Sequence, residues 1–408
     1  MNKEWVAETL EHLSRIGRTE QNGSNRLAYT KEDREAREYF KELMRKANLT
    51  VREDAAGNII GRLEGTDPNA PAVATGSHID TVPNGGHYDG MVGSVGGLAA
   101  IMRLQERGPL THPLELIIFQ MEESSRFAMA TFGSKVMVGK LGSVTARGLK
   151  DKNGVYLPDA MEEFGLDVER LDEAVRKKGE LKCFLEMHIE QSPTLEHENL
   201  GVGIVTAIAA PIRSQIKITG KASHSGGTSM NNRKDALVTA SEIVLAVRTV
   251  ANRFSRQQIV GTVGNLVVRP GAMNVVPGEV ELWIDLRGTN RAVMDEAQAA
   301  IEAAVQGIAA AHGTPTKLKQ LSADNPVAMT PEVIATLEAS AKALEIPSMR
   351  IVSGAGHDTM NIAEITDVGM IFIRNTDGLS HHPEEHASID DIMQGLDLLT
   401  ETMYQMAK

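Results

Sequence analysis

The sequence predicts an α/β fold in which a large discontinuous domain, with a mixed sheet flanked by helices, carries a smaller inserted two-layer α/β domain. The chain has 408 residues, whereas single hydrophobic cores stop growing near about 250–300 residues. Short apolar runs bounded by Gly and Pro alternate with helical patterns in the N-terminal half, which is typical of an α/β sheet. Between residues 212 and 321 the order of the elements changes, which indicates a second domain.

The larger domain is expected to span residues 1–211 and 322–408. It begins with two helices, Trp5–Ile16 and Thr30–Ala47, because apolar residues recur there at helical spacing. Its predicted strands are Asn58–Leu63, Ala72–Ile79, Leu114–Phe119, Cys183–His188 and Val368–Ile373. Two further helices are predicted at Val92–Arg107 and Ile389–Met406.

The smaller domain is expected to span residues 212–321. Its order is strand, long helix, two strands, long helix and strand, which describes a self-contained two-layer unit. The predicted elements are Arg213–Thr219, Lys234–Arg253, Ile259–Val268, Glu279–Arg287, Ala292–His312 and Thr316–Leu321.

Composition excludes several classes of protein. Hydrophobic residues make up 42% of the chain and charged residues 24%, which disfavours disordered, collagen-like and membrane proteins. The net charge of −12 disfavours a nucleic-acid partner, because phosphate binding needs clustered Lys and Arg. Cys183 is the single cysteine, which fits a reducing compartment. With no visible secretory signal and no membrane-spanning run, we expect a cytoplasmic protein with no membrane partner.

Polar side chains that can bind metal follow four of the predicted strands. Taken alone, His78 is more often an ordinary polar residue, and the pair Glu122–Glu123 is more often an exposed acidic turn. Four strand ends that each offer His or carboxylate form a strong pattern, because open α/β sheets bind ligands at the carboxyl ends of their strands. The residues are His78, Asp80 and Asp89 after the first strand, Glu122 and Glu123 after the second, His188 on the third and His381 or His382 after the fourth.

His, Asp and Glu ligands without Cys suit a pair of divalent ions. Zinc is the first choice, with manganese, cobalt or nickel as alternatives. Calcium and magnesium avoid sites rich in imidazole. The predicted cofactor is therefore two divalent metal ions per subunit.

At these motifs the chain resembles the metal-dependent aminoacylase/carboxypeptidase superfamily. Within it, the chain is most similar to the hydantoinase/carbamoylase branch of N-carbamoyl-L-amino acid hydrolases, allantoate amidohydrolases and ureidopropionases. The resemblance runs from Gly76-Ser-His-Ile-Asp-Thr81 to Ser380-His-His-Pro-Glu-Glu385. It implies Glu122 as general base, Asp80 as the carboxylate behind His78, and five metal ligands: His78, Asp89 as a bridge, Glu123, His188 and His381. The family motif Ser-His-x-Pro selects His381 over His382.

The resemblance extends to residues expected to contact the substrate. His224 resembles the histidine that stabilises the tetrahedral intermediate, and Asn274 and Arg287 resemble the pair that binds the substrate carboxylate. Gln191 and Gly356 match positions near the substrate, and His357 and Asp358 are expected behind the ligands. The inserted domain is then a lid and dimerisation domain, and the protein is expected to form a homodimer.

The implied function is hydrolysis of a linear amide or ureido C–N bond in a small, carboxylate-bearing substrate, with an N-carbamoyl-L-amino acid as the first candidate. Alternatives are an allantoate amidohydrolase, an aminoacylase or dipeptidase, and a catalytically inactive binding protein of the same fold. The chain departs from the family at Ser124, where glycine is usual, and in the loop His224–Met230. Both departures lie beside the expected substrate, so a non-standard substrate is a further alternative.

Overall fold

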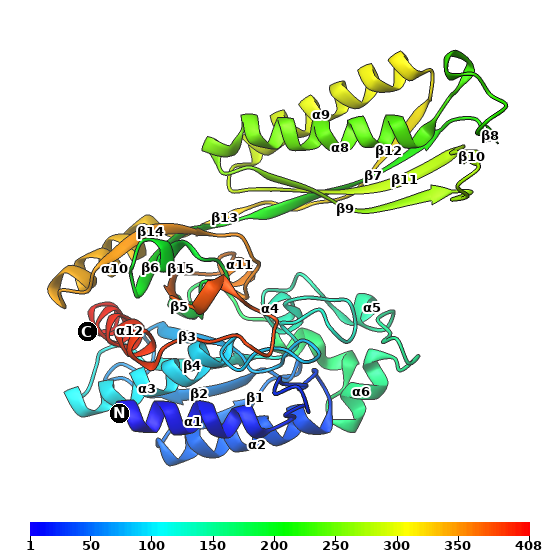
Figure 1. The fold of residues 1–408 in the computed structure, drawn as a ribbon. Helices are drawn as coiled ribbons and strands as arrows, with labels where there is room; N and C mark the ends of the chain where they lie inside the picture. Colours follow the sequence, from blue (N-terminus) through cyan, green and yellow to red (C-terminus); the bar gives the residue numbers. More distant parts are fainter. The chain divides into compact units, whose positions relative to one another are not determined.

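The computed structural model of the protein describes residues 1–408, which form two compact units (Figure 1). The larger unit comprises residues 1–206, 329–353 and 357–408, and the smaller unit comprises residues 207–328 and 354–356. The smaller unit is longer than the 212–321 expected from the sequence. The difference arises because the chain enters and leaves it through an antiparallel pair, Ile208 with Val327 and Ala207 with Ala328.

The larger unit is built on a mixed sheet, as the sequence predicts. The strand order is β1-β2-β4-β3-β5-β15-β6, with β14 paired to β6. The four central strands β4, β3, β5 and β15 are mutually parallel, whereas β1, β2 and β6 pair antiparallel. The strands are β1 Thr50–Glu53, β2 Ile59–Leu63, β3 Ala72–His78, β4 Leu114–Phe119, β5 Leu181–Ile189, β6 Val202–Ile208, β14 Ser348–Ser353 and β15 Asp367–Ile373.

Helices cover the central strands and bury them. The long helix α3 packs on β3, β4 and β5, and α12 packs on α3, β5 and β15. All residues of β3 and β4 are buried, as expected for central strands that are covered on both faces. The main helices of this unit are α1 Lys3–Arg15, α2 Lys31–Lys46, α3 Met91–Arg107, α10 Pro331–Ala343 and α12 Ile389–Ala407.

The segment from 120 to 180 forms short helices that the sequence pattern does not predict. They surround a separate hydrophobic cluster that includes Phe127, Phe132 and Leu157. None is long enough to show a clear helical period. The short helices of the larger unit are α4 Phe132–Met137, α5 Ser143–Ala146, α6 Leu157–Glu163, the 3₁₀ helix Val168–Ala174, α7 Thr194–His197, α11 Thr359–Ile362 and the 3₁₀ turn Thr376–Gly378.

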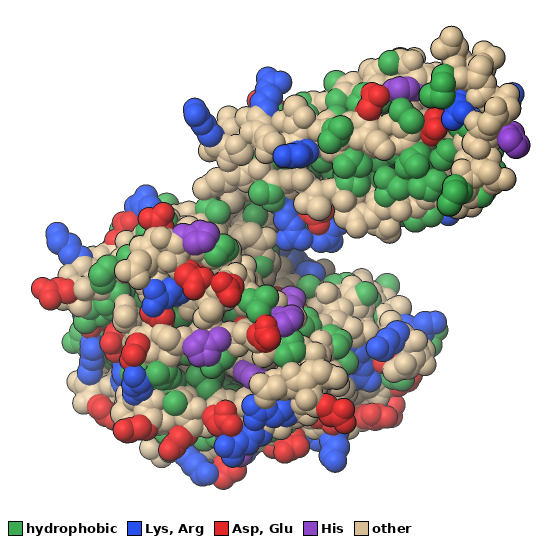
Figure 2. All heavy atoms as spheres, viewed as in Figure 1, with side chains coloured by type: hydrophobic (Ala, Val, Ile, Leu, Met, Phe, Trp, Pro, Cys, Tyr) green, Lys and Arg blue, Asp and Glu red, His purple; other side chains and the backbone are tan.

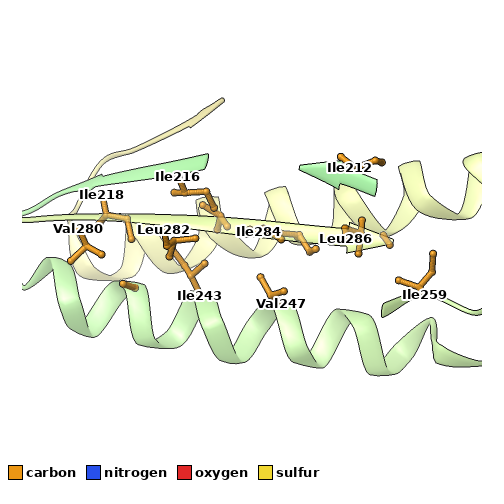
Figure 3. Packing of buried hydrophobic residues seen from close by; sticks show 14 of the residues in the cluster. Ile212, Ile216, Ile218, Ile243, Val247, Ile259, Val280, Leu282, Ile284 and Leu286 are labelled. Carbon is orange, nitrogen blue, oxygen red and sulfur yellow. The ribbon is translucent and has the colours of Figure 1, made fainter. Parts of the chain in front are cut away.

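The smaller unit is a four-stranded antiparallel sheet, ordered β12-β7-β11-β9, with α8 and α9 on one face (Figure 1). Side chains of β11 alternate between buried and half-buried, and the buried ones face the helices (Figure 3). Its elements are β7 Ala210–Thr219, β8 Ser223–His224, α8 Ala236–Arg253, β9 Val260–Arg269, β10 Val275–Val276, β11 Glu279–Gly288, α9 Arg291–His312, β12 Thr316–Ala323, β13 Val327–Ala328 and the 3₁₀ turns Met230–Asn232 and Ser255–Gln257.

The predicted fold class is confirmed. No helix of the structure has the length and apolar character needed to cross a bilayer. Cys183 is a buried free thiol on β5.

Gly76 fixes the contact between β3 and β4. A Cβ built at this position would lie 1.8 Å from the carbonyl oxygen of Ile117 on β4. We therefore expect Gly76→Ala to lower the free energy of unfolding by about 1–3 kcal/mol or more, because the strands must separate. Denaturant unfolding measures this change. Gly148→Ala is the matched control, since its Cβ would meet only Thr145 O at 3.5 Å; equal losses in both variants would contradict the argument.

Candidate metal centre

The residues expected to bind metal gather at one edge of the central sheet. Strands β4, β3, β5 and β15 are neighbours and run parallel, so their carboxyl ends meet at this edge. His78 ends β3, His188 is the penultimate residue of β5, and Glu122 and Glu123 follow β4. His381 lies in the loop between β15 and α12.

Two histidine rings face the Asp89 carboxylate with the same nitrogen. The His78 Nδ1 lies 3.0 Å from the carbonyl oxygen of Asp80, and the His188 Nδ1 lies 2.9 Å from that of Ile189. A carbonyl oxygen only accepts, so each Nδ1 carries a proton and donates it. The Nε2 atoms lie 3.3 and 3.2 Å from Asp89 Oδ1. Each ring thus directs Nε2 toward the same point, as metal-binding histidines do.

A second group of three side chains includes the other carboxylate oxygen of Asp89, Oδ2. The His381 Nε2 is 3.1 Å from Glu123 Oε1 and 3.6 Å from Asp89 Oδ2. The two groups, His78 with Asp89 and His188, and Asp89 with Glu123 and His381, each place one donor atom per residue within 4.8 Å of the others. They share Asp89. His382 is exposed, and its Nδ1 accepts from the backbone N–H of Glu384.

Glycine makes room for this arrangement. Gly90 follows Asp89 with a φ of 71°, and a Cβ there would lie 2.5 Å from the His78 ring. Its N–H donates to His188 Nε2 at 3.2 Å. Gly90 therefore allows the backbone to pass directly beside both rings.

The charge balance of the cluster fits a cation. Asp80, Asp89, Glu122 and Glu123 are buried or nearly so, and buried like charges are costly unless a cation or a proton lies between them. Burial lowers the pKa of His78, but Asp89, Glu122 and Asp80 raise it well above its usual value. A proton is thereby drawn to the position between imidazole and carboxylate that a metal ion would fill. The donors and charges present thus fit two divalent ions of the kind that bind nitrogen and oxygen.

Glu122 and Asp80 are the two carboxylates outside these groups of three. Burial raises the pKa of Glu122 well above its ordinary value, and Glu123, Asp358 and Asp80 add to the rise against the opposing effect of His78. The Glu122 Oε2 lies 3.9 Å from His78 Nε2. A carboxyl group with a raised pKa at this position is suited to take up and return a proton.

Asp80 contacts His78 differently from the expectation. The backbone carbonyl of Asp80, rather than its carboxylate, is nearest the ring, because Oδ1 lies 3.7 Å from Nδ1. The carboxylate accepts the backbone N–H groups of Glu122 and Glu123, each at 3.1 Å. Burial raises its pKa to about 7. Asp80 therefore orients the segment that carries both glutamates.

Three further side chains hold Asp89 and its loop. Gln191 Nε2 donates to Asp89 Oδ2 at 2.7 Å, and Ser380 Oγ donates to the same oxygen at 2.5 Å. The buried Glu385 accepts the backbone N–H groups of Tyr88 and Asp89. Ser380 and Glu385 were not among the residues selected from the sequence. Glu385 ends the motif that contains His381, but its partners are backbone N–H groups, which the sequence does not reveal.

His357 and Asp358 lie beside the ligands. The ring of His357 contacts that of His188, with centroids 4.5 Å apart, and its Nε2 is 3.0 Å from Ser353 Oγ. Burial and the charge of His188 lower its pKa well below the ordinary value. Burial raises the pKa of Asp358 to about 8. Both pKa shifts favour the uncharged form of the side chain.

The remaining predicted residues belong to the smaller unit. His224 and Asn274 are adjacent, since Ser225 N donates to Asn274 O at 3.0 Å. The exposed His224 ring accepts two backbone N–H groups at Nδ1, from Gly226 at 3.1 Å and Gly227 at 3.0 Å.

Arg287 is also on this unit. Its Nε donates to Asp285 at 2.9 Å and its Nη1 to the carbonyl of Gly354 at 3.0 Å. The arginine thus lies against the short segment 354–356 that carries Gly356.

Comparison with known proteins relates the whole chain to one family. The model of peptidase family M20/M25/M40 matches residues 74–405. An N-carbamoyl-L-amino-acid amidohydrolase of Pseudomonas is 39% identical, with 99% of this chain and 98% of that protein covered. A ureidoglycolate hydrolase of Arabidopsis thaliana is 37% identical (98% and 85%), and an allantoate amidohydrolase of Bacillus subtilis is 34% identical (99% and 98%).

A solved structure agrees. An amidase of the hydantoinase/carbamoylase family from Burkholderia multivorans superposes with a TM-score of 0.93 at 33% identity, covering 100% of this chain and 98% of that one. The resemblance read from the sequence motifs is therefore confirmed: the chain is a hydrolase and belongs to peptidase family M20/M25/M40.

Proposed function

We propose that this protein is a dinuclear-metal amidohydrolase that cleaves the ureido C–N bond of an N-carbamoyl-L-amino acid. The observation that carries the proposal is the pair of donor groups that share Asp89, with the protonatable Glu122 beside them. His78, Asp89 and His188 would hold one ion, and Asp89, Glu123 and His381 the other. Zinc is the first choice by donor type.

Two bound divalent ions would supply a water of lowered pKa and polarise the substrate carbonyl. Glu122 takes up the proton of the attacking water at its carboxylate and returns it to the leaving nitrogen. Asp80 holds the backbone of Glu122 in place during both transfers. Gln191 presents its Oε1, which is buried and has no hydrogen-bond partner, as an acceptor for a substrate N–H.

In this proposal His224, Asn274, Arg287 and Gly356 also contact the substrate. Arg287 binds the substrate carboxylate through the guanidinium N–H groups that Asp285 and Gly354 leave free, because a planar guanidinium can donate several parallel hydrogen bonds. Asn274 and Gly356 bind the same end of the substrate. His224 donates from Nε2 to the developing oxyanion, since its Nδ1 is already an acceptor.

Allantoate is the second candidate substrate. It also carries a carboxylate and ureido groups, and the relative from Bacillus subtilis is named for its hydrolysis. None of the three relatives described above is named as an aminoacylase, a dipeptidase or a binding protein. The buried free Cys183 is compatible with the reducing cytoplasm as the site of action.

The function is tested with the purified, zinc-loaded protein by measuring the ammonia that it releases from ureido substrates and the free amino acid that it releases from N-acetyl-L-amino acids. N-carbamoyl-L-amino acids, allantoate, ureidoglycolate and N-acetyl-L-amino acids are compared, together with an N-carbamoyl amine that lacks the carboxylate. We expect turnover of N-carbamoyl-L-amino acids and none of the amine. Arg287→Ala should raise KM about 10- to 100-fold, as expected for loss of a charge-assisted pair worth about 1.5–3 kcal/mol. Turnover of the N-acetyl compounds alone would contradict the proposal.

Replacing the proposed general base tests its role separately. Glu122→Gln keeps the size of the side chain but cannot accept the proton. We expect kcat to fall by about 10²–10⁴-fold, while the bound metal stays at two ions per chain by elemental analysis. Asp172→Asn, a change in an exposed carboxylate of the 3₁₀ helix, is the matched control. Activity of Glu122→Gln near the wild-type level would remove Glu122 from the mechanism.

We further infer a homodimer formed through the smaller unit. Large apolar side chains are exposed there, with Leu245 and Val238 on α8 and Val260 on the edge strand β9, and Figure 2 shows hydrophobic side chains gathered on this unit. Exposed apolar patches mark interaction surfaces. Sedimentation equilibrium should give a mass twice that of the chain and a monomer for Leu245→Glu with Val260→Glu. A monomeric wild-type protein at micromolar concentration would contradict the inference.

A further inference from the structure

We propose that Glu385 is a positioning residue that joins the loop carrying Asp89 to the loop carrying His381, and so sets the affinity of one metal position. The position concerned is the one formed by Asp89, Glu123 and His381. The inference rests on the metal centre of the proposed function and adds a residue that neither binds metal nor contacts substrate in that proposal.

Glu385 uses both carboxylate oxygens. Its Oε1 accepts the backbone N–H of Tyr88 at 2.8 Å and that of Asp89 at 3.0 Å. Its Oε2 lies 3.1 Å from Ser380 Oγ. The single proton of that hydroxyl lies toward the nearer acceptor, Asp89 Oδ2 at 2.5 Å. The side chain is buried. The Glu385 carboxylate therefore holds the backbone of Asp89 directly and lies against Ser380, which donates to the Asp89 side chain.

The facing loop is shaped to receive this carboxylate. A Cβ built on Gly86 would lie 2.2 Å from Glu385 Oε1 and from its carboxyl carbon. Gly86 has no left-handed φ, and the three atoms nearest to a Cβ there all belong to Glu385. Hydrogen bonds from N–H groups to a carboxylate are stronger than those between neutral groups. The bonds from Tyr88 and Asp89 to Glu385 are therefore suited to hold the Asp89 loop in one position.

The two metal positions differ in how their histidines are held. The rings of His78 and His188 sit on strands, and each Nδ1 donates to a backbone carbonyl. His381 sits in a loop with a φ of 57°, its side chain is half exposed, and its ring makes its polar contacts through Nε2. Glu385 lies four positions after His381 and, through its hydrogen bonds to the loop of Asp89, holds the His381 loop in place. Loss of Glu385 should therefore weaken the position that includes His381 more than the other.

Zinc titration of the chelator-treated full chain tests this, with calorimetry to count the ions and measure their affinities. Wild-type protein should bind two zinc ions. In Glu385→Ala one ion should bind about 10- to 100-fold more weakly, the usual effect of losing a residue that orients metal ligands, and the other ion should lose less affinity. Glu385→Gln should recover part of the loss, because its carbonyl oxygen can still accept both backbone N–H groups.

The controls separate this role from a general effect on folding. Glu384→Ala changes the exposed neighbour and should bind both ions normally. Gly86→Ala should displace Glu385 from the opposite loop and weaken the same ion, so the test holds even where Glu385→Ala does not fold. Wild-type affinity for both ions in Glu385→Ala and Gly86→Ala, or equal weakening of both ions, would overturn the inference. Failure of the wild-type chain to bind two ions would instead overturn the proposed function.

Discussion

The need to neutralise buried carboxylates at one sheet edge is the constraint on which the rest of this structure depends. Asp89 is enclosed by two imidazoles on one oxygen and by His381, Gln191 and Ser380 on the other. Burial alone would raise the pKa of this carboxyl group, but the adjacent histidines His188 and His78 lower it well below its ordinary value. Asp89 thus stays ionised in a buried setting, which is what a carboxylate that bridges two cations requires.

The architecture supplies that setting through close backbone contacts. Four parallel strands deliver their carboxyl ends to one edge, and the absence of a side chain at Gly76 and Gly90 lets β4 and the His78 ring approach closely. Backbone carbonyls at Asp80 and Ile189 then fix the tautomer of each strand histidine. The main chain therefore fixes the orientation of both strand histidines.

The sequence predicts those parts of the fold in which apolar residues recur at a regular spacing. The buried run of β4 is predicted as Leu114–Phe119 and found there, and the long helices start and end within about two residues of their expected bounds. The short helices between residues 120 and 180 escape prediction because tertiary contacts, not periodicity, determine them. The positions of Asp80 and Glu385 escape it for a different reason. Their partners are backbone N–H groups, which leave no trace in the pattern of side chains.

The central claim is that Asp89 lies between two metal ions. Anomalous diffraction at the zinc edge, from crystals of the zinc-loaded protein, tests it most directly. The account predicts two peaks about 3.5–4 Å apart, one about 2.0–2.1 Å from the Nε2 atoms of His78 and His188 and the other at the same distance from that of His381. A single peak, or two peaks that do not both contact Asp89, would contradict it.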